Sequence, residues 1–131
     1  MAKPTVLVAD DHGIVLTRVV SLLTPRFDLV GTVMNGRDLV TEAERLNPDV
    51  IVLDITMPVL SGIEAAHELR KKGSGARLVF LTVHTSREFV EACVEAGALA
   101  YVTKSHLVSD LVSAIDMALA GKTFVSTNVL G

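Results

Sequence analysis

Short runs of apolar residues alternate along the chain with longer stretches in which apolar positions recur at helical spacing. The apolar runs are rich in β-branched residues and cover residues 5–9, 28–33, 50–53, 78–82 and 99–102. A run that is apolar at nearly every position is typical of a strand buried on both faces of a sheet. The pattern therefore predicts five buried strands, each followed by a helix.

The first two predicted helices have clear end signals. The first covers residues 14–23 and stops at Pro25, which cannot continue a helix. The second begins after Asn35, a typical N-cap residue, and Asp38 three positions later resembles the second half of a capping box. This helix is expected to end before Pro48.

Glycines mark the ends of the other three predicted helices. The third follows Gly62 and ends before Gly73, and the fourth runs from about Arg87 to a C′ residue at Gly97. The fifth has one apolar face, formed by Leu107, Leu111, Ile115 and Leu119. Five strands that alternate with five helices predict an α/β fold in which a doubly wound parallel sheet carries helices on both faces. The expected strand order is 2-1-3-4-5, the flavodoxin-like arrangement, with a switch point between strands 1 and 3.

Composition agrees with a single folded domain. The chain has 131 residues, of which 50% are hydrophobic, 21% charged and 4% aromatic. Five doubly covered strands account for the high content of Val, Leu and Ile. The apolar runs are far shorter than a membrane span, and a single cysteine cannot form an intrachain disulfide, so a cytoplasmic location is expected. The net charge of −3 gives this segment no electrostatic reason to bind nucleic acid.

Polar residues follow four of the predicted strands where each strand ends. Asp10 and Asp11 follow the first strand, Asp54 follows the third, Thr82 ends the fourth and Lys104 follows the fifth. In an open α/β sheet the carboxyl ends of the strands near the switch point form the ligand site. A lone aspartate there is more often a helix cap, but agreement on four strands indicates a site.

The residue types at this edge point to phosphoryl transfer. Three carboxylates repel one another unless a cation or another partner neutralises them, and Lys104 supplies only one positive charge. A hard divalent cation such as Mg²⁺ prefers carboxylate and carbonyl oxygens. A metal beside a carboxylate, an ammonium and a hydroxyl provides a nucleophile and neutralises the charge of a transferred phosphoryl group.

Four segments resemble the receiver domain of two-component response regulators, the CheY-like family, from about residue 5 to residue 122. They are VLVADDH (6–12), PDVIVLDITMPVLSGIEAA (48–66), LVFLTVH (78–84) and AGALAYVTKS (96–105). The DDH opening, the Ser after Lys104 and the C-terminal GKTFVS resemble the NarL/FixJ subfamily, whose members usually carry a LuxR-type helix-turn-helix domain after the receiver.

The resemblance implies roles for the polar residues. Asp54 is similar to the phosphoacceptor, which takes a phosphoryl group from the phosphohistidine of a sensor histidine kinase or a phosphotransfer protein. Asp11 and Asp10 resemble the direct and indirect ligands of Mg²⁺ or Mn²⁺, which Asp54 and the backbone carbonyl of Thr56 would also bind. Lys104 would pair with a phosphoryl oxygen.

Other residues are implied in switching and tuning. Thr82 would bond to the phosphoryl group, and Tyr101 would turn inward as Thr82 moves, which changes the face formed by the fourth helix, the fifth strand and the fifth helix. Thr56, Val83 and His84 flank the acceptor pocket and would tune the phosphoryl lifetime. Val83 is bulkier than the residue that many members have there, and Ser105 replaces a common proline.

The resemblance also suggests the organisation of the protein and its partners. Residues 1–122 are expected to form the receiver, and residues 123–131 to begin a linker to a C-terminal DNA-binding domain, so that DNA is contacted only through that domain. A homodimer on phosphorylation is expected, and no membrane contact. Such a domain is not an enzyme in the ordinary sense, because it catalyses only its own phosphorylation and dephosphorylation.

Three alternatives remain open. The chain is a stand-alone receiver if nothing follows residue 131. It is a small Mg²⁺-dependent phosphohydrolase if the same residues act on a diffusible substrate, although no second acid in a DxD pattern follows the first strand. It is a receiver-like domain without phosphorylation if the site has lost metal binding. His12 is expected at the pocket rim without a role, and Cys93 as a small packing residue.

Overall fold

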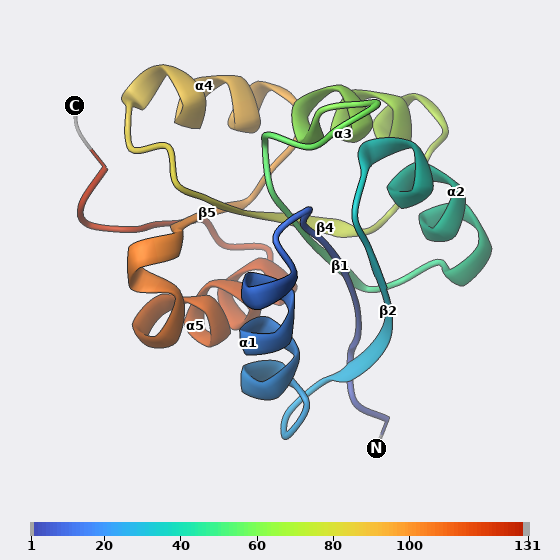
Figure 1. Ribbon diagram of the computed structural model, residues 1–131, viewed down its shortest axis with the longest axis horizontal. Helices are drawn as coiled ribbons and strands as arrows, with labels where there is room; N and C mark the ends of the chain where they lie inside the picture. Colours follow the sequence, from blue (N-terminus) through green and yellow to red (C-terminus); the bar gives the residue numbers. More distant parts are fainter. Residues whose placement is uncertain (1, 130–131) are drawn as a thin grey trace.

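The computed structural model describes residues 2–129 and contains the predicted alternation of strands and helices (Figure 1). The strands are β1 Thr5–Ala9, β2 Asp28–Val33, β3 Val50–Leu53, β4 Arg77–Thr82, β5 Ala100–Thr103 and β6 Phe124–Val125. The helices are α1 Gly13–Leu23, α2 Gly36–Leu46, α3 Gly62–Lys71, α4 Arg87–Glu95 and α5 Leu107–Leu119, with a 3-10 turn η1 at Lys104–His106 before α5. The five predicted strands and five predicted helices are therefore present, and their bounds shift by about one residue.

The sheet is parallel and its order is β2-β1-β3-β4-β5-β6. The predicted order of the first five strands is confirmed. The sixth strand was not predicted: Phe124 and Val125 pair with Ala100 and Tyr101 of β5. The first part of the segment expected to begin a linker, residues 123–131, thus lies against the sheet edge, whereas residues 130 and 131 lie outside the described part.

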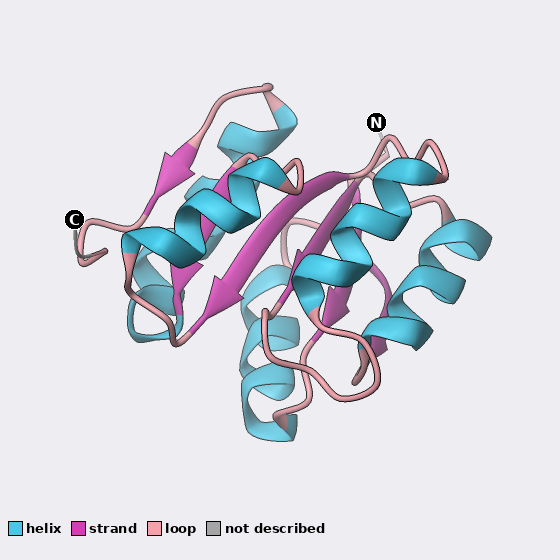
Figure 2. Cartoon of the chain, turned by 90° about the horizontal axis from the view of Figure 1, so that it is seen from above, coloured by secondary structure: helices cyan, strands magenta, loops and turns pink. Residues whose placement is uncertain are grey.

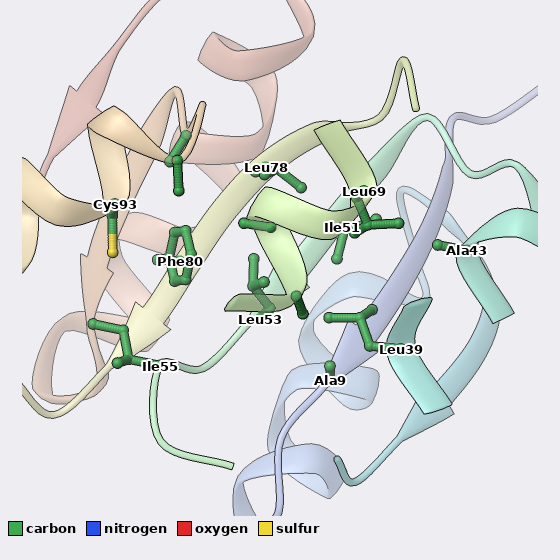
Figure 3. Close-up of a cluster of buried hydrophobic side chains, with 14 of the residues drawn as sticks. Ala9, Leu39, Ala43, Ile51, Leu53, Ile55, Leu69, Leu78, Phe80 and Cys93 are labelled. Atoms are coloured by element: carbon green, nitrogen blue, oxygen red, sulfur yellow. The ribbon is translucent and has the colours of Figure 1, made fainter. Parts of the chain in front are cut away.

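Helices cover both faces of the sheet, as Figure 2 shows from above. Helices α2, α3 and α4 lie on one side of the strands and α1 and α5 on the other (Figure 1). Central strands β3 and β5 are buried at every position, because both their faces are covered. Each face has its own core, and Figure 3 shows the one beneath α2, α3 and α4, where Leu53 and Phe80 meet helix side chains such as Leu39 and Leu69.

The ends at Asn35 and Gly97 follow the predicted capping chemistry, and Asn47 and Ser61 provide caps that were not predicted. The side chain of Asn35 accepts a hydrogen bond from the amide of Asp38, and Asn47 ends α2 in the left-handed conformation. Helix α3 starts with a full capping box between Ser61 and Glu64. Gly97 has a φ of 101° after α4, a conformation that an L side chain rarely adopts. No helix in the described part of the chain is long and apolar enough to cross a membrane.

Candidate functional site

Four strands end at the same edge of the sheet and bring the predicted polar residues together. Because β1, β3, β4 and β5 are parallel and paired in order, the residues that follow them lie side by side. Asp10 and Asp11 follow β1, Asp54 follows β3, Thr82 ends β4 and Lys104 follows β5. The topology thus places all five residues at one site.

Lys104 joins two buried carboxylates. Its ammonium Nζ lies 2.8 Å from Oδ2 of Asp54 and 2.9 Å from Oδ2 of Asp10. The two carboxylate side chains are each 3% exposed, and that of Lys104 is 10% exposed. The contact with Asp54 is a directed hydrogen bond, whereas Oδ2 of Asp10 is an ion-pair partner without a hydrogen bond of good geometry. The site therefore holds one cation against two desolvated anions.

Opposing effects act on the pKa of Lys104. Burial is the largest single effect and lowers this pKa, but the hydrogen bond to Asp54, the close contact with Asp10 and the negative charges of both carboxylates together outweigh it. The net result is a pKa raised above that of an ordinary lysine. Lys104 is thus a permanent cation at neutral pH.

His12 lies closer to the site than its sequence position suggested. Its Nδ1 lies 3.1 Å from Oδ1 of Asp10 and 3.1 Å from Oδ1 of Asp11, and 3.3 Å from Nζ of Lys104. Its ring is largely exposed, so the expected place at the rim is correct, but it contacts both carboxylates. The DDH spacing alone does not reveal this contact, because it depends on how α1 starts.

The acidic residues fit a divalent cation. One ligand atom from each of Asp10, Asp11, His12 and Asp54 lies within 4.8 Å of the others. Within residues 2–129, Oδ2 of Asp10 and Oδ1 of Asp11 are buried carboxylate oxygens that have no hydrogen-bond partner, although Lys104 and His12 lie at ion-pair distance from them. Buried oxygens without donors are costly unless a cation approaches them. Carboxylate oxygens are the ligands that Mg²⁺ prefers, so the donor set suits that ion.

The loop after β3 fixes the orientation of Asp54. The backbone amide of Ile55 donates a 2.7 Å hydrogen bond to Oδ1 of Asp54, which leaves Oδ2 to Lys104. The amide of Gly62 donates to the carbonyl of Ile55 at 2.8 Å and folds the loop back onto the strand. A Cβ atom at Gly62 would collide with the backbone carbonyl of Asp54. Only glycine allows this close approach.

A second set of contacts links the site to the start of α4. The hydroxyl of Tyr101 donates a 2.8 Å hydrogen bond to the backbone carbonyl of His84, and the tyrosine ring is buried inside the domain. The ring of His84 stacks on Phe89 with 4.0 Å between centroids, and its Nε2 lies 3.1 Å from Oγ1 of Thr56. Thr82 is fully buried beside this loop. Phe89 was not predicted, since its contact depends on the path of residues 83–86.

Exposed apolar residues surround this edge of the sheet. Val83, after β4, is 65% exposed. Ile14 in the first turn of α1, Val59 in the loop after β3, and Val108 in the first turn of α5 are also largely exposed. Apolar side chains that gather around a polar site are typical of a surface that meets another protein.

Sequence comparisons place these residues in a known context. The profile of the response regulator receiver domain matches residues 6–116. The nitrate/nitrite response regulator protein NarL of Escherichia coli (strain K12) is 36% identical over 124 residues, which cover 93% of this chain and 57% of that protein. The chain therefore spans a little over half the length of this relative.

Solved structures agree with the sequence comparisons. A two-component response regulator of the LuxR family from Aurantimonas sp. SI85-9A1 is similar with a TM-score of 0.91 at 32% identity, covering 98% of this chain and 93% of that chain. A DNA-binding response regulator of the LuxR family from Staphylococcus aureus gives a TM-score of 0.84 at 28% identity, with coverage of 88% and 98%.

Proposed function

This chain belongs to the family of response regulator receiver domains of the NarL/LuxR type, and from this premise we propose that it is a phosphorylation switch with Asp54 as the acceptor. The observation that carries the proposal is the buried Asp54 carboxylate, held by the Ile55 amide and the Lys104 ammonium beside two further aspartates. The donor is a phosphohistidine of a sensor histidine kinase or a phosphotransfer protein.

The geometry supports a simple displacement at phosphorus. A carboxylate oxygen of Asp54 attacks the phosphorus atom, the new O–P bond forms, and the N–P bond to the donor histidine breaks with its electron pair leaving on the imidazole nitrogen. Mg²⁺ or Mn²⁺, held by Asp10, Asp11, Asp54 and the Thr56 carbonyl, would neutralise charge on the phosphoryl oxygens. Lys104 stays charged through the step and turns from the carboxylate to a phosphoryl oxygen.

The output of the switch is the face formed by α4, β5 and α5. Thr82 is buried next to the acceptor and is the hydroxyl that bonds to a phosphoryl oxygen. Tyr101 responds to this change because its hydroxyl is hydrogen-bonded to the backbone carbonyl of His84, just before α4. Thr56, Val83 and His84 flank the acceptor and set how long the phosphoryl group lasts. A local change in charge is thereby converted into a movement of one helix.

A protein donor suits this site better than a diffusible phosphate ester. The acceptor is nearly buried, and the apolar residues around it, Ile14, Val59, Val83 and Val108, offer a docking surface for another protein. These features favour a receiver over a small phosphohydrolase. Turnover of a small phosphate ester by the isolated domain would favour the hydrolase.

The downstream role is transcriptional control through a C-terminal helix-turn-helix domain. The relatives that match this chain include response and transcriptional regulators of which the matched segment covers only 56–57% of the length. In such a protein the receiver dimerises on phosphorylation and DNA is bound only by the further domain. A stand-alone receiver is the second possibility, and the natural sequence that follows residue 131 distinguishes the two outputs, whereas sedimentation with and without a phosphoryl mimic tests the dimer.

Intact-mass spectrometry after incubation with Mg²⁺ and a small phosphodonor tests the acceptor. The protein should gain one phosphoryl group, and Asp54→Asn should gain none. Asp28→Asn, which changes an exposed aspartate at the start of β2, is the matched control and should behave as the unaltered chain. A gain that persists in Asp54→Asn, or that does not depend on Mg²⁺ or Mn²⁺, contradicts the proposal.

A further inference from the structure

Buried polar side chains form two groups that meet at Lys104. Across residues 2–129 the buried polar or charged residues are Asp10, Asp54, Thr82, Thr103 and Ser126. The first three belong to the acceptor site. Thr103 and Ser126 lie on the other side of Lys104 and have no part in the phosphoryl chemistry described above. Buried polar groups are costly unless hydrogen-bonded, so this second group needs an explanation.

The second group fastens the segment after α5 to β5 and η1. The backbone amide of Thr103 donates to Oγ of Ser126 at 3.2 Å, and the Thr103 hydroxyl donates to Oδ1 of Asn128 at 2.8 Å. Oγ of Ser126 donates in turn to Oδ2 of Asp110 at 2.8 Å, and Nδ2 of Asn128 donates to Oγ of Ser105 at 3.1 Å. These five residues are joined by one network of hydrogen bonds.

Backbone pairing continues the attachment. The amide of Phe124 donates to the carbonyl of Leu99 at 3.1 Å, and the amide of Ser126 donates to the carbonyl of Tyr101 at 3.0 Å. Residues 124–128 therefore form a strap along the outer edge of β5 (Figures 1 and 2). The strap is bonded to β5, η1 and α5, and Phe124 packs against the core on the α1 and α5 face.

The strap and the acceptor site depend on the same three consecutive residues. Thr103 and Ser105 bind the strap, and Lys104 between them binds Asp54 and Asp10. Lys104 is also the first residue of η1, which contains Ser105, whereas Thr103 is the last residue of β5. A displacement of Lys104 therefore changes the geometry of the strap contacts on either side of it.

We propose that release of the strap is coupled to phosphorylation of Asp54. This inference rests on the proposed function. Phosphorylation moves negative charge from the Asp54 carboxylate to oxygens farther from β3, and Lys104 follows this charge. The shift in η1 moves Ser105 relative to Thr103, which stays in β5, so Asn128 can no longer bond to both hydroxyls, the strap loosens and the chain after it gains freedom. The coupling is a difference in free energy between two positions of η1, which both sites sense.

Hydrogen exchange of the 131-residue chain tests the coupling. Beryllium fluoride with Mg²⁺ serves as the phosphoryl mimic, and exchange is followed in peptides that cover residues 124–129. We expect exchange there to become about fivefold faster or more when the mimic binds, while peptides in α1 stay unchanged. Unchanged or slower exchange in the strap, with the mimic bound, overturns the coupling alone. Failure to bind the mimic overturns the proposed function as well.

Thermodynamic reciprocity gives a second measurement. If the mimic loosens the strap, a weaker strap must raise the affinity for the mimic by the corresponding factor. Asn128→Ala removes two strap bonds at a partly exposed position and should tighten beryllium fluoride binding about fivefold or more. Ser126→Ala should do the same. Thr127→Ala, at the exposed position between them, is the matched control and should leave the affinity unchanged. Equal affinities in all three variants contradict the coupling.

Discussion

Helices α4 and α5 lie on opposite faces of the sheet beside β5 and are held very unequally (Figure 1). Helix α5 buries five side chains: Leu107, Leu111, Ala114, Ile115 and Ala118. Helix α4 fully buries only Cys93, although Phe89 and Val90 add partial contacts. A buried large apolar side chain contributes about 1.5–3 kcal/mol. The sheet therefore anchors α5 several times more strongly than α4.

The two helices begin alike, without a side-chain capping bond, and differ in how many contacts hold their last turns. Ser86 precedes α4 without a side-chain capping bond, and Arg70 contributes a 3.0 Å hydrogen bond to the carbonyl of Glu95 at its other end. The carbonyl of Ala118 in the last turn of α5 accepts a 2.9 Å hydrogen bond from Arg77, and Arg26 pairs with Asp116 at 3.0 Å. Arg77 begins β4 and Arg26 lies just before β2, so both contacts link the end of α5 to other parts of the fold.

This difference suits a switch. An element that responds to a small change must be drawn from the weakly held part of a fold, because its displacement then costs little free energy. Helix α4 follows the loop to which Tyr101 is hydrogen-bonded, whereas α5 follows the turn that carries Lys104. Helix α4 is therefore the less firmly held of the two, as the proposed switch requires.

The largest expected effect on stability comes from truncating a buried side chain that packs α5 against the sheet. Leu111→Ala leaves a cavity at a fully buried position and should lower the free energy of unfolding by about 2–5 kcal/mol. Val94→Ala, at an exposed position of α4, should stay within about 0.5 kcal/mol of the parent. Urea unfolding measures both. Equal losses in the two variants would show that the helices are anchored alike.

Hydrogen exchange should resolve the two helices in the unaltered chain. Because α5 buries at least two more large apolar side chains than α4, the opening free energy of α4 should be lower by about 2 kcal/mol or more, which is about a thirtyfold faster exchange. Amide exchange by NMR in the native state measures this for each residue. Exchange of both helices in one cooperative step would contradict the comparison.

The sequence predicted where the two helices lie and not how deeply each is buried. Alternation of apolar runs and helical spacing located both helices, and the polar strand ends located Asp54 and Lys104, because parallel strands bring their carboxyl ends to one edge. The depth of burial of α4 was not visible, since it depends on how the helix sits on the sheet. A residue such as Val94 looks apolar in the sequence yet is exposed.

Contacts between loops were also outside the reach of the sequence. The His84–Phe89 stack and the approach of His12 to Asp10 each depend on the path of a loop or a helix start. The two-residue strand β6 is too short to give a periodic signal, and its attachment depends on side chains such as Ser126, which look like ordinary linker residues. Local patterns predict elements, whereas these contacts arise only when the elements are assembled.

A smaller effect is expected where Tyr101 meets the loop before α4. Tyr101→Phe keeps the ring and removes the 2.8 Å hydrogen bond to the His84 carbonyl, which should cost about 0.5–1.5 kcal/mol. The loss should appear as faster amide exchange in α4 and no change in α5. Thr17→Val, which removes a hydroxyl that donates within α1, is the control and should leave α4 unaffected. Uniform acceleration of both helices would mean that Tyr101 holds the whole domain.

The smallest effect concerns the single buried residue of α4 and appears only in alkali. Burial raises the pKa of Cys93 to about 12, whereas the thiol of an unfolded chain has a pKa of about 8.5. Above that pH the unfolded chain loses a proton that the native chain keeps, so the free energy of unfolding must fall as pH rises toward the native pKa. Tyr101 and Lys104 also have raised pKa values and act in the same direction, but only above the higher pH at which their unfolded forms titrate.

Between about pH 8.5 and 9.5 the fall in the free energy of unfolding therefore comes from Cys93. Cys93→Ala should make this fall shallower by up to about 1 kcal/mol per pH unit, as measured by urea unfolding at each pH. An unchanged slope in Cys93→Ala would show that α4 already opens in the native state and exposes the thiol, which would make it even less firmly held than its one buried side chain implies.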